Sequence, residues 1–293
     1  MNRELVAAIE SAIQSGSDTI DLLDITLDEV ADSIDDLRIF SSIRLGGIHS
    51  DSLPDAIFAL DQVRSLYIER STITKLPDAL GNLTNLHELY ISCCPYFRTL
   101  PDEIRKLSHL ESLFLFKNGI NVLPPSIGEL PNLHRVAVTE NELFEVPDFA
   151  SSSAIIELNL SGNRLNRIPS SIYSMRQLQI LNLSANRISE SSFAEKNFQN
   201  VSWLNLSRNS IHNIASGVVW DTIIDLDLSF NSLHVIPKVL LTFPKLKLLN
   251  LTGNSQLTRS DFEAFQREVS RLRPSTPITT IFSTPFHRAS EPE

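Results

Sequence analysis

The chain is built from copies of one short pattern. Segments of the form LxxLxLxxNxLxxLP recur along it, for example IIELNLSGNRLNRIP at 155–169 and IIDLDLSFNSLHVIP at 223–237. Weaker copies carry the series back to residues 19–30. A chain with this kind of period folds as a stack of similar units, because one unit cannot bury its own apolar face.

One column of the repeat fixes its register. Successive members of this column lie 22 to 24 residues apart. Asn is the commonest occupant, and a buried Asn side chain can satisfy the backbone groups of the turn that follows a strand. The column therefore predicts a ladder of Asn side chains, with less regular coils at the first two positions, where Ile replaces Asn. Its members are Ile25, Ile48, Ser71, Cys94, Asn118, Asn141, Asn163, Asn186, Asn209, Asn231 and Asn254.

The motif LxL predicts a short strand in each coil. Its two apolar side chains lie on one face of the strand, and the residue between them points to the other face. In seven coils Pro follows the last apolar position, and Pro suits the start of a helical turn. We therefore expect short helical or 3₁₀ turns across the coil from the strands, in PDAIFAL, PDALGNL, PDEIRKL and PPSIGEL.

The first end of the stack needs a cap, because a terminal coil would otherwise expose its core. Apolar residues at helical spacing predict a helical cap within residues 1–18, and Gly16 can end that helix. The predicted apolar stripe is Leu5, Ile9, Ala12 and Ile13.

The last end is predicted to carry a capping helix over residues 259–273. Ser260 and Glu263 have the spacing of a capping box, and Pro274 ends the helix. The Ser/Thr/Pro-rich segment 274–293 is expected to be a flexible tail, although its IFSTPF stretch could instead fold back onto the last coil. The predicted stripe of the helix is Phe262, Phe265, Val269 and Leu272.

With this repeat, the chain resembles the leucine-rich repeat family over about residues 19–258. The form LPxxIxxL is similar to the subclass found in Ras-associated scaffolds, Roco proteins and some bacterial effectors. The resemblance implies an α/β solenoid, a curved horseshoe of about 11 coils with a parallel sheet on the concave face and helical or 3₁₀ turns on the convex face. It also implies protein partners such as GTPases, kinases, phosphatases or ubiquitin machinery.

Charge and hydropathy exclude several other classes. The net charge of -10 argues against a nucleic-acid partner, which would call for a basic face. The sequence contains no run of 18 apolar residues, so it predicts no membrane span. The N-terminus also lacks the pattern of a signal peptide. We therefore expect a cytoplasmic protein, or alternatively one translocated into a host cell by a specialised secretion system. The two adjacent cysteines cannot form a disulfide scaffold.

The negative charge is concentrated at the start of the chain. Residues 1–36 contain ten acidic residues and one basic residue, Arg3. The plain interpretation is a solvated cap that aids solubility. The functional alternative is an acidic docking surface for a basic partner.

Motifs for catalysis or for a cofactor are not found, so the sequence predicts a protein that is not an enzyme and has no metal. Cys94 falls in the ladder column, where Cys is an ordinary structural choice. His212 and His234 share a column and should lie roughly 5 Å apart, but no third ligand accompanies them. His87, His109 and His134 form no predicted cluster.

The candidate binding surface lies on the strand face of coils two to six. There the middle column of the strands carries aromatic residues, with charged residues around them, which is the composition of protein-binding hot spots. The alternative is that these rings only pack on each other to cover the sheet. The candidate protein-binding residues are Arg44, Tyr67, Glu69, Arg70, Tyr90, Phe114, Phe116, Lys117 and Arg135.

From coil seven onward the same face is mostly Asn, Asp, Ser and Thr, which is typical of a solvated sheet. A weaker apolar group there consists of Ile180, Trp203 and Leu248. It could be a dimer contact, or these side chains could simply cover the sheet, although the sequence favours a monomer.

Three functions remain open. The first is a non-catalytic scaffold that binds a protein or peptide on its concave face. The second is a translocated bacterial effector or a regulatory subunit that modulates a signalling enzyme. The third, an activity in the chain itself, would require a clustered nucleophile and base, which the sequence does not provide.

Overall fold

The computed structural model describes residues 3–24, 30, 32–149, 153–189 and 197–282. The chain divides into two compact units. The first comprises Met1–Arg164 with Met175–Leu178, and the second comprises Leu165–Ser174 with Gln179–Glu293. Both units are made of the same repeating coil of strand, turn and return segment.

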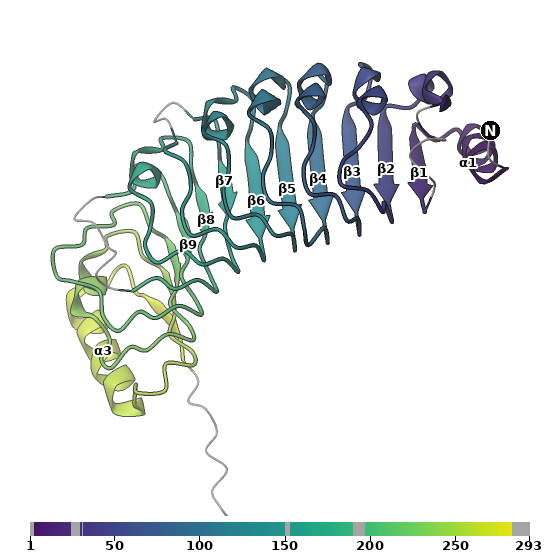
Figure 1. Cartoon of the computed structure of the whole chain (residues 1–293). Coiled ribbons are helices and arrows are strands. Elements are labelled where there is room, and N and C mark those ends of the chain that lie inside the picture. The colour runs from purple at the N-terminus through teal and green to yellow at the C-terminus, as the bar shows by residue number, and fades with distance from the viewer. Residues whose placement is uncertain (1–2, 25–29, 31, 150–152, 190–196, 283–293) are drawn as a thin grey trace, which may run out of the picture. The chain divides into compact units, whose positions relative to one another are not determined.

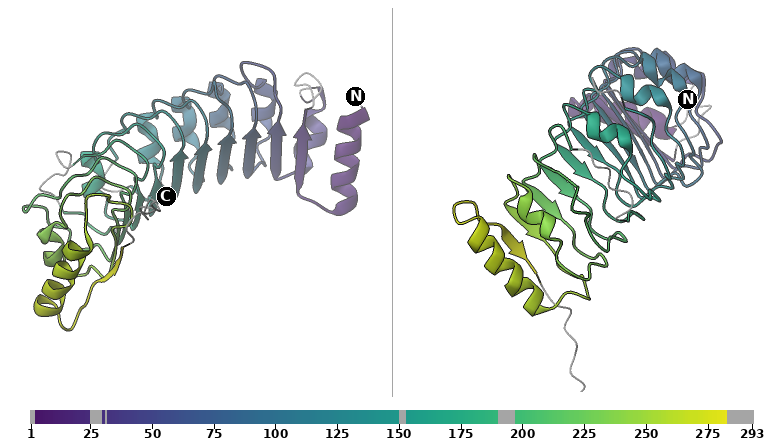
Figure 2. Two further views of the ribbon diagram at one scale, coloured as in Figure 1. Left: turned by 90° about the horizontal axis from the view of Figure 1, so that it is seen from below. Right: turned by 90° about the vertical axis from the view of Figure 1, so that its left-hand side faces the viewer.

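The first unit begins with helix α1 (Arg3–Ser15), which lies beside the first strand (Figure 2). Seven parallel strands follow in chain order, and each pairs with the next (Figure 1). Their bounds are β1 Thr19–Leu23, β2 Ser42–Gly46, β3 Ser65–Glu69, β4 Glu88–Ser92, β5 Ser112–Phe116, β6 Arg135–Thr139 and β7 Glu157–Asn159.

Short 3₁₀ turns return the chain between these strands, as the Pro residues predicted. Pro54, Pro77, Pro101 and Pro124 each directly precede a turn, with φ between -73° and -65°, the value to which the pyrrolidine ring restricts them. The buried residues of the turns, such as Ile57 and Phe58, face the core of the coil. The turns are η1 Ile34–Ile39, η2 Asp55–Ala59, η3 Asp78–Asn82, η4 Asp102–Lys106 and η5 Pro125–Glu129.

The second unit contains five parallel strands, again paired in chain order. Helix α3 (Arg259–Leu272) and the last strand lie next to each other at the end of this unit (Figure 2). The other elements are η6 Ser170–Ser174, β8 Ile180–Asn182, β9 Trp203–Asn205, β10 Asp225–Asp227, η8 Lys238–Thr242, β11 Leu248–Asn250 and β12 Thr279–Ile281.

The strand registers confirm the predicted columns. In the first unit Arg44, Tyr67, Tyr90 and Phe114 are successive partners, and in the second Asn182, Asn205, Asp227 and Asn250 are. The flanking Leu and Ile of each LxL motif are buried, so the residue between them points away from the core. We call this outward side of the strands the strand face.

The predicted Asn ladder is present from Asn118 to Asn254. In each step the side-chain oxygen accepts a backbone N–H of the preceding coil, at 2.9 to 3.2 Å. The amide nitrogen of Asn231, for example, donates to the carbonyls of Leu206 and Leu228. Ser71 replaces Asn in an earlier coil, and its hydroxyl accepts the N–H of Ile48. The ladder therefore joins consecutive coils through buried polar groups. Ile25 lies outside the described residues.

A residue with positive φ precedes the ladder residue in each coil. Eight of these residues are not glycine, with φ between 47° and 57°. This conformation is unfavourable for residues with a Cβ. It is held here because the N–H of the residue usually donates to the next coil, as from Arg70 to Ser92 and from Lys117 to Thr139. We call these positions the turn column.

The N-terminal cap ends as predicted. Gly16 has φ 67°, its N–H donates to Ile13, and the N–H of Ser17 donates to Ala12, which together form a Schellman motif. Leu5 and Ala12 are buried, but the prediction for Ile13 was wrong, because this side chain is 54% exposed. Ile13 lies at the last turn of α1, on the solvent side of the stripe.

The C-terminal cap differs in detail from the prediction. The capping box is formed by Thr258 and Asp261 rather than Ser260 and Glu263, since the Thr258 hydroxyl accepts the Asp261 N–H and the Asp261 carboxylate accepts the Thr258 N–H. Phe265 and Val269 are buried, whereas Leu272 is exposed.

Part of the segment predicted as a loose tail is a strand. β12 extends the sheet beyond β11, and Gln266 of α3 hydrogen-bonds to Thr280. The Phe282 ring stacks on Phe262 of α3 with the ring centroids 5.3 Å apart. Of the IFSTPF stretch (281–286), Ile281 and Phe282 fold back onto the last strand and α3, and residues 283–293 lie outside the described part of the chain.

Candidate functional site

Four aromatic rings of the strand face form one connected group in the first unit. The ring centroids of Tyr67 and Tyr90 are 5.7 Å apart, those of Tyr90 and Phe116 are 5.4 Å apart, and those of Phe114 and Phe116 are 5.9 Å apart. Tyr90 also meets Phe114 edge-on at 6.5 Å. We call these four residues the aromatic row. All four side chains remain half-buried, so the row has both internal packing and an accessible surface.

The row follows directly from the register of β3, β4 and β5. Neighbouring parallel strands lie about 4.8 Å apart, which places aromatic side chains in one column within contact distance. The next strand has small residues in the same two columns, Ala137 and Thr139. These are 8% and 9% exposed although they lie on the strand face. Phe114 and Phe116 are their partners in the register.

Arg44 extends the row on its other side. Its guanidinium lies 5.3 Å from the centre of the Tyr67 ring, within cation–π distance. Its Nη1 atom also pairs with the Asp21 carboxylate at 3.2 Å. The stacked guanidinium is therefore held in place from two directions.

Glu88 is a member of this surface that the sequence analysis missed. The Tyr67 hydroxyl donates to its Oε2 atom at 2.8 Å. Burial raises the pKa of Tyr67, and the Glu88 carboxylate raises it further. Glu88 is two residues before Tyr90 on the same face of β4, and this period-two spacing could have revealed it.

The remaining candidate residues lie on β3 or β6, or directly after β3 or β5. Arg135 donates from Nε to the Ser112 hydroxyl at 3.1 Å. Lys117 pairs with Glu140 at 3.6 Å. Glu69 is half-buried at the end of β3, and Arg70 is exposed. Arg70 and Lys117 belong to the turn column, so they line the edge of the surface where the strands end.

On the strand face of the second unit, polar side chains form hydrogen bonds with the backbone rather than only with solvent. The Asn or Asp that ends each of β8 to β11 accepts the N–H two residues ahead, as Asn205 does from Ser207 and Asp227 from Ser229. Such Asx turns compete with strand pairing. This explains why strands β7 to β11 are three residues long whereas β1 to β6 have five.

The thiol of Cys94 is poorly placed to act as a nucleophile. Cys94 is buried in the ladder column, and burial raises the pKa of its thiol to about 11. A thiol that is buried and protonated at neutral pH is a poor nucleophile. Cys93 is exposed and takes a turn-column conformation with φ 54°.

Two histidine pairs are present. His212 and His234 have ring centroids 5.5 Å apart, close to the predicted spacing. His87 and His109 stack at 5.8 Å, which corrects the expectation that they form no cluster. The Nδ1 atom of His109 also lies 2.9 Å from the carbonyl oxygen of Thr84 in the preceding coil, within hydrogen-bond distance. Within the described residues, no three His, Cys, Asp or Glu side chains are placed to hold a metal ion.

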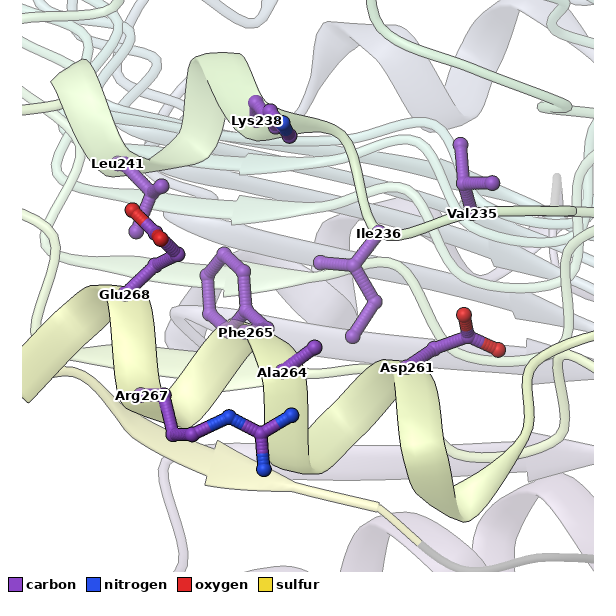
Figure 3. Close-up of a pocket in the computed structure, with 9 residues that line it drawn as sticks. All are labelled: Val235, Ile236, Lys238, Leu241, Asp261, Ala264, Phe265, Arg267 and Glu268. Atoms are coloured by element: carbon purple, nitrogen blue, oxygen red, sulfur yellow. The ribbon is translucent and has the colours of Figure 1, made fainter.

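A groove of about 450 Å³ lies between η8 and α3 in the second unit (Figure 3). Figure 3 shows Phe265 and Ala264 of α3 facing Ile236 and Leu241, which lie between β10 and β11. The carboxylate of Asp261 at one end caps the helix, so much of this lining serves the packing of α3. None of the candidate binding residues lies here. No helix in the described part of the chain is long and apolar enough to cross a lipid bilayer.

Comparison with known proteins agrees with this geometry. The leucine rich repeat family model matches residues 131–188. Against curated proteins the chain has no significant match.

Several solved structures share the fold at low identity. A chain of the octameric complex of Latrophilin 3, Unc5D and FLRT2 (LRR) is similar with a TM-score of 0.68 and 20% identity, over 92% of this chain and 85% of that chain. An internalin (inlF) from Listeria monocytogenes is similar with a TM-score of 0.62 and 18% identity, over 97% and 89%. The structure of PEPR1-AtPEP1 is similar with a TM-score of 0.59 and 23% identity, over 82% of this chain and 34% of that chain.

Proposed function

This chain is a leucine-rich repeat protein, and we propose that it is a non-catalytic scaffold that binds a protein or peptide on the strand face of coils two to six. The observation that carries the proposal is the aromatic row, whose rings are in mutual contact and still half-exposed. Similar solved structures include complexes of repeat proteins with other proteins, which supports the class of function.

The row has the physical properties of a binding hot spot. Its rings are held by one another, by the Arg44 guanidinium and by the Tyr67–Glu88 hydrogen bond, so little side-chain freedom remains to be lost on binding. Rigid aromatic side chains supply large contact areas, and the charged residues around them can form a polar rim. A partner with an apolar segment flanked by polar or charged residues fits this arrangement.

A double variant, Tyr90→Ala with Phe114→Ala, tests this function. We expect it to lose the partner that the wild-type protein captures from native cell extract. Loss of one central anchor alone is worth about 2 kcal/mol or more, which corresponds to about a 30-fold loss of affinity. Affinity capture followed by titration of the recovered partner measures the effect.

The matched control is Ile39→Ala, which removes another exposed apolar side chain, from η1 (63% exposed). It should retain the partner. Equal capture by the double variant and the wild type, with both folded by circular dichroism, would move the binding surface elsewhere.

The alternative, a translocated effector or a regulatory subunit, uses the same physical surface. It differs only in the identity of the partner, which would be a host signalling enzyme or a subunit encoded with this chain. Capture from host extract and from native extract distinguishes the two.

A further inference from the structure

The strand face of the second unit carries a different group of residues. In the first column of its strands, Ile180, Trp203, Asp225 and Leu248 are successive partners from β8 to β11. Their neighbours Leu181, Leu204, Leu226 and Leu249 are buried, so the four side chains point outward. Three apolar side chains, one of them an indole, thus flank a carboxylate.

A second carboxylate lies on the same face of the same strand. Asp227 follows Asp225 by two residues, and its partners in the register are Asn205 and Asn250. Asp227 accepts the Ser229 N–H and the Asn250 side-chain amide. In these two columns of β8 to β11, the charged residues are the two aspartates, and both are negative.

Of the two aspartates, Asp225 has fewer hydrogen-bond partners among the described residues. It is half-buried between Trp203 and Leu248, and its carboxylate has no hydrogen bond or ion pair with any residue that the structure describes. Burial raises its pKa, and repulsion from Asp227 raises it further. The ionised Asp225 carboxylate is therefore disfavoured in the folded protein alone, and a bound cation would stabilise it.

We infer that this surface binds an extended polypeptide segment through one Arg or Lys side chain, which lies on the Trp203 ring and pairs with Asp225 and Asp227. An indole face attracts cations, and the neighbouring strand is close enough, at about 4.8 Å, for one guanidinium to reach both the ring and a carboxylate. A polypeptide is favoured over a free small cation because the surface is an open sheet. Apolar residues beside the basic one can contact Ile180 and Leu248, which a lone cation cannot do.

Selection from a display library of random seven-residue peptides tests this inference. Peptides selected on the wild-type protein should be enriched in Arg or Lys beside apolar residues. For a selected arginine peptide, replacement of Arg by the neutral isostere citrulline should weaken binding at least about tenfold. Asp225→Asn and Trp203→Leu should each weaken it to a similar extent, measured by calorimetry.

Two controls keep the test specific. Glu263→Gln makes the same change in net charge on α3 and should leave the affinity unchanged, which excludes attraction to the overall negative chain. Asp225→Asn should remain folded. The folded-state pKa is raised above the ordinary value of 3.8, so ionisation at pH 7 disfavours folding and the neutral variant should melt no lower than the wild type.

An absence of selected peptides, selection without basic residues, or equal affinity for the Asp225→Asn variant would each overturn the inference. This result is independent of the aromatic row, since Tyr90→Ala with Phe114→Ala leaves all residues of this surface intact.

Discussion

Replacement of Arg273 by Ala is expected to lower the free energy of unfolding by about 3–5 kcal/mol. The Arg273 side chain is 8% exposed and has no carboxylate partner among the described residues. Its guanidinium donates to three backbone carbonyls of the segment between η8 and β11, those of Phe243, Pro244 and Leu246, at 3.0 to 3.1 Å. Without it these carbonyls lose a charged donor, although that of Phe243 still accepts the Leu246 N–H, and the end of α3 no longer bonds to the loop after η8. Urea denaturation at pH 7 measures the change.

Arg271 provides the matched control for Arg273. It lies two residues earlier, and its side chain is exposed and pairs with Glu268 on the helix surface. Arg271→Ala should unfold within error of the wild type, because exposed ion pairs contribute little. An Arg273→Ala variant as stable as Arg271→Ala would show that the three hydrogen bonds do not hold the cap.

Replacement of Asn231 by Leu is expected to lower the free energy of unfolding by about 3 kcal/mol. Leu keeps a similar volume but removes the acceptor for the Ile211 N–H. It also removes one of the two side-chain donors to each of the Leu206 and Leu228 carbonyls, which still accept from Asn209 and Asn254. All these groups are buried, so water does not replace the lost partner. Denaturant titration gives the magnitude, and hydrogen exchange at the Ile211 amide should accelerate most.

Asn132→Ala is the comparison for the ladder variant. The exposed Asn132 side chain also donates to a backbone carbonyl, that of Ser108, at 2.8 Å. Because this group is exposed, its loss should change stability by no more than about 0.5 kcal/mol. A similar small effect at Asn231 would mean that the ladder is incidental to stability.

The repeat alone predicts most of the fold, because two periodicities act together. The LxL motif determines which strand residues are buried, and the spacing of 22 to 24 residues determines which residues are neighbours in adjacent coils. The structure confirms both, from the partnership of Tyr67 with Tyr90 to the hydrogen bonds of Asn118 through Asn254. Six of the seven Pro residues likewise predict the positions of 3₁₀ turns, η2 to η6 and η8, whereas η1 follows Ser33.

Features that depend on the ends of the stack were harder to predict. β12 has no LxL motif, and it pairs with β11 because the last strand leaves an open edge. The capping box began two residues earlier than predicted, since both Thr258 and Ser260 have an acidic residue three positions ahead. The role of Arg273 could not be predicted from the sequence, because its three acceptors are backbone carbonyls that only the fold brings together.

The candidate surface was predictable where it depended on register and not where it depended on side-chain geometry. The aromatic row follows from two columns, since Tyr67, Tyr90 and Phe114 lie in the middle column and Phe116 in the column after it. The contacts of Tyr67 with Glu88 and of Arg135 with Ser112 depend on rotamers. Asp225 was also missed, because its lack of a hydrogen bond or ion pair with any described residue is visible only once the neighbouring side chains are placed.

Photo-crosslinking from position 90 tests the proposed function most directly. Benzoylphenylalanine replaces Tyr90 in the full chain, and a second protein carries it at Ile39 on η1. Irradiation in native cell extract should join the captured partner to position 90 and leave position 39 unreacted. A crosslink from position 39 without one from position 90 would contradict binding on the aromatic row.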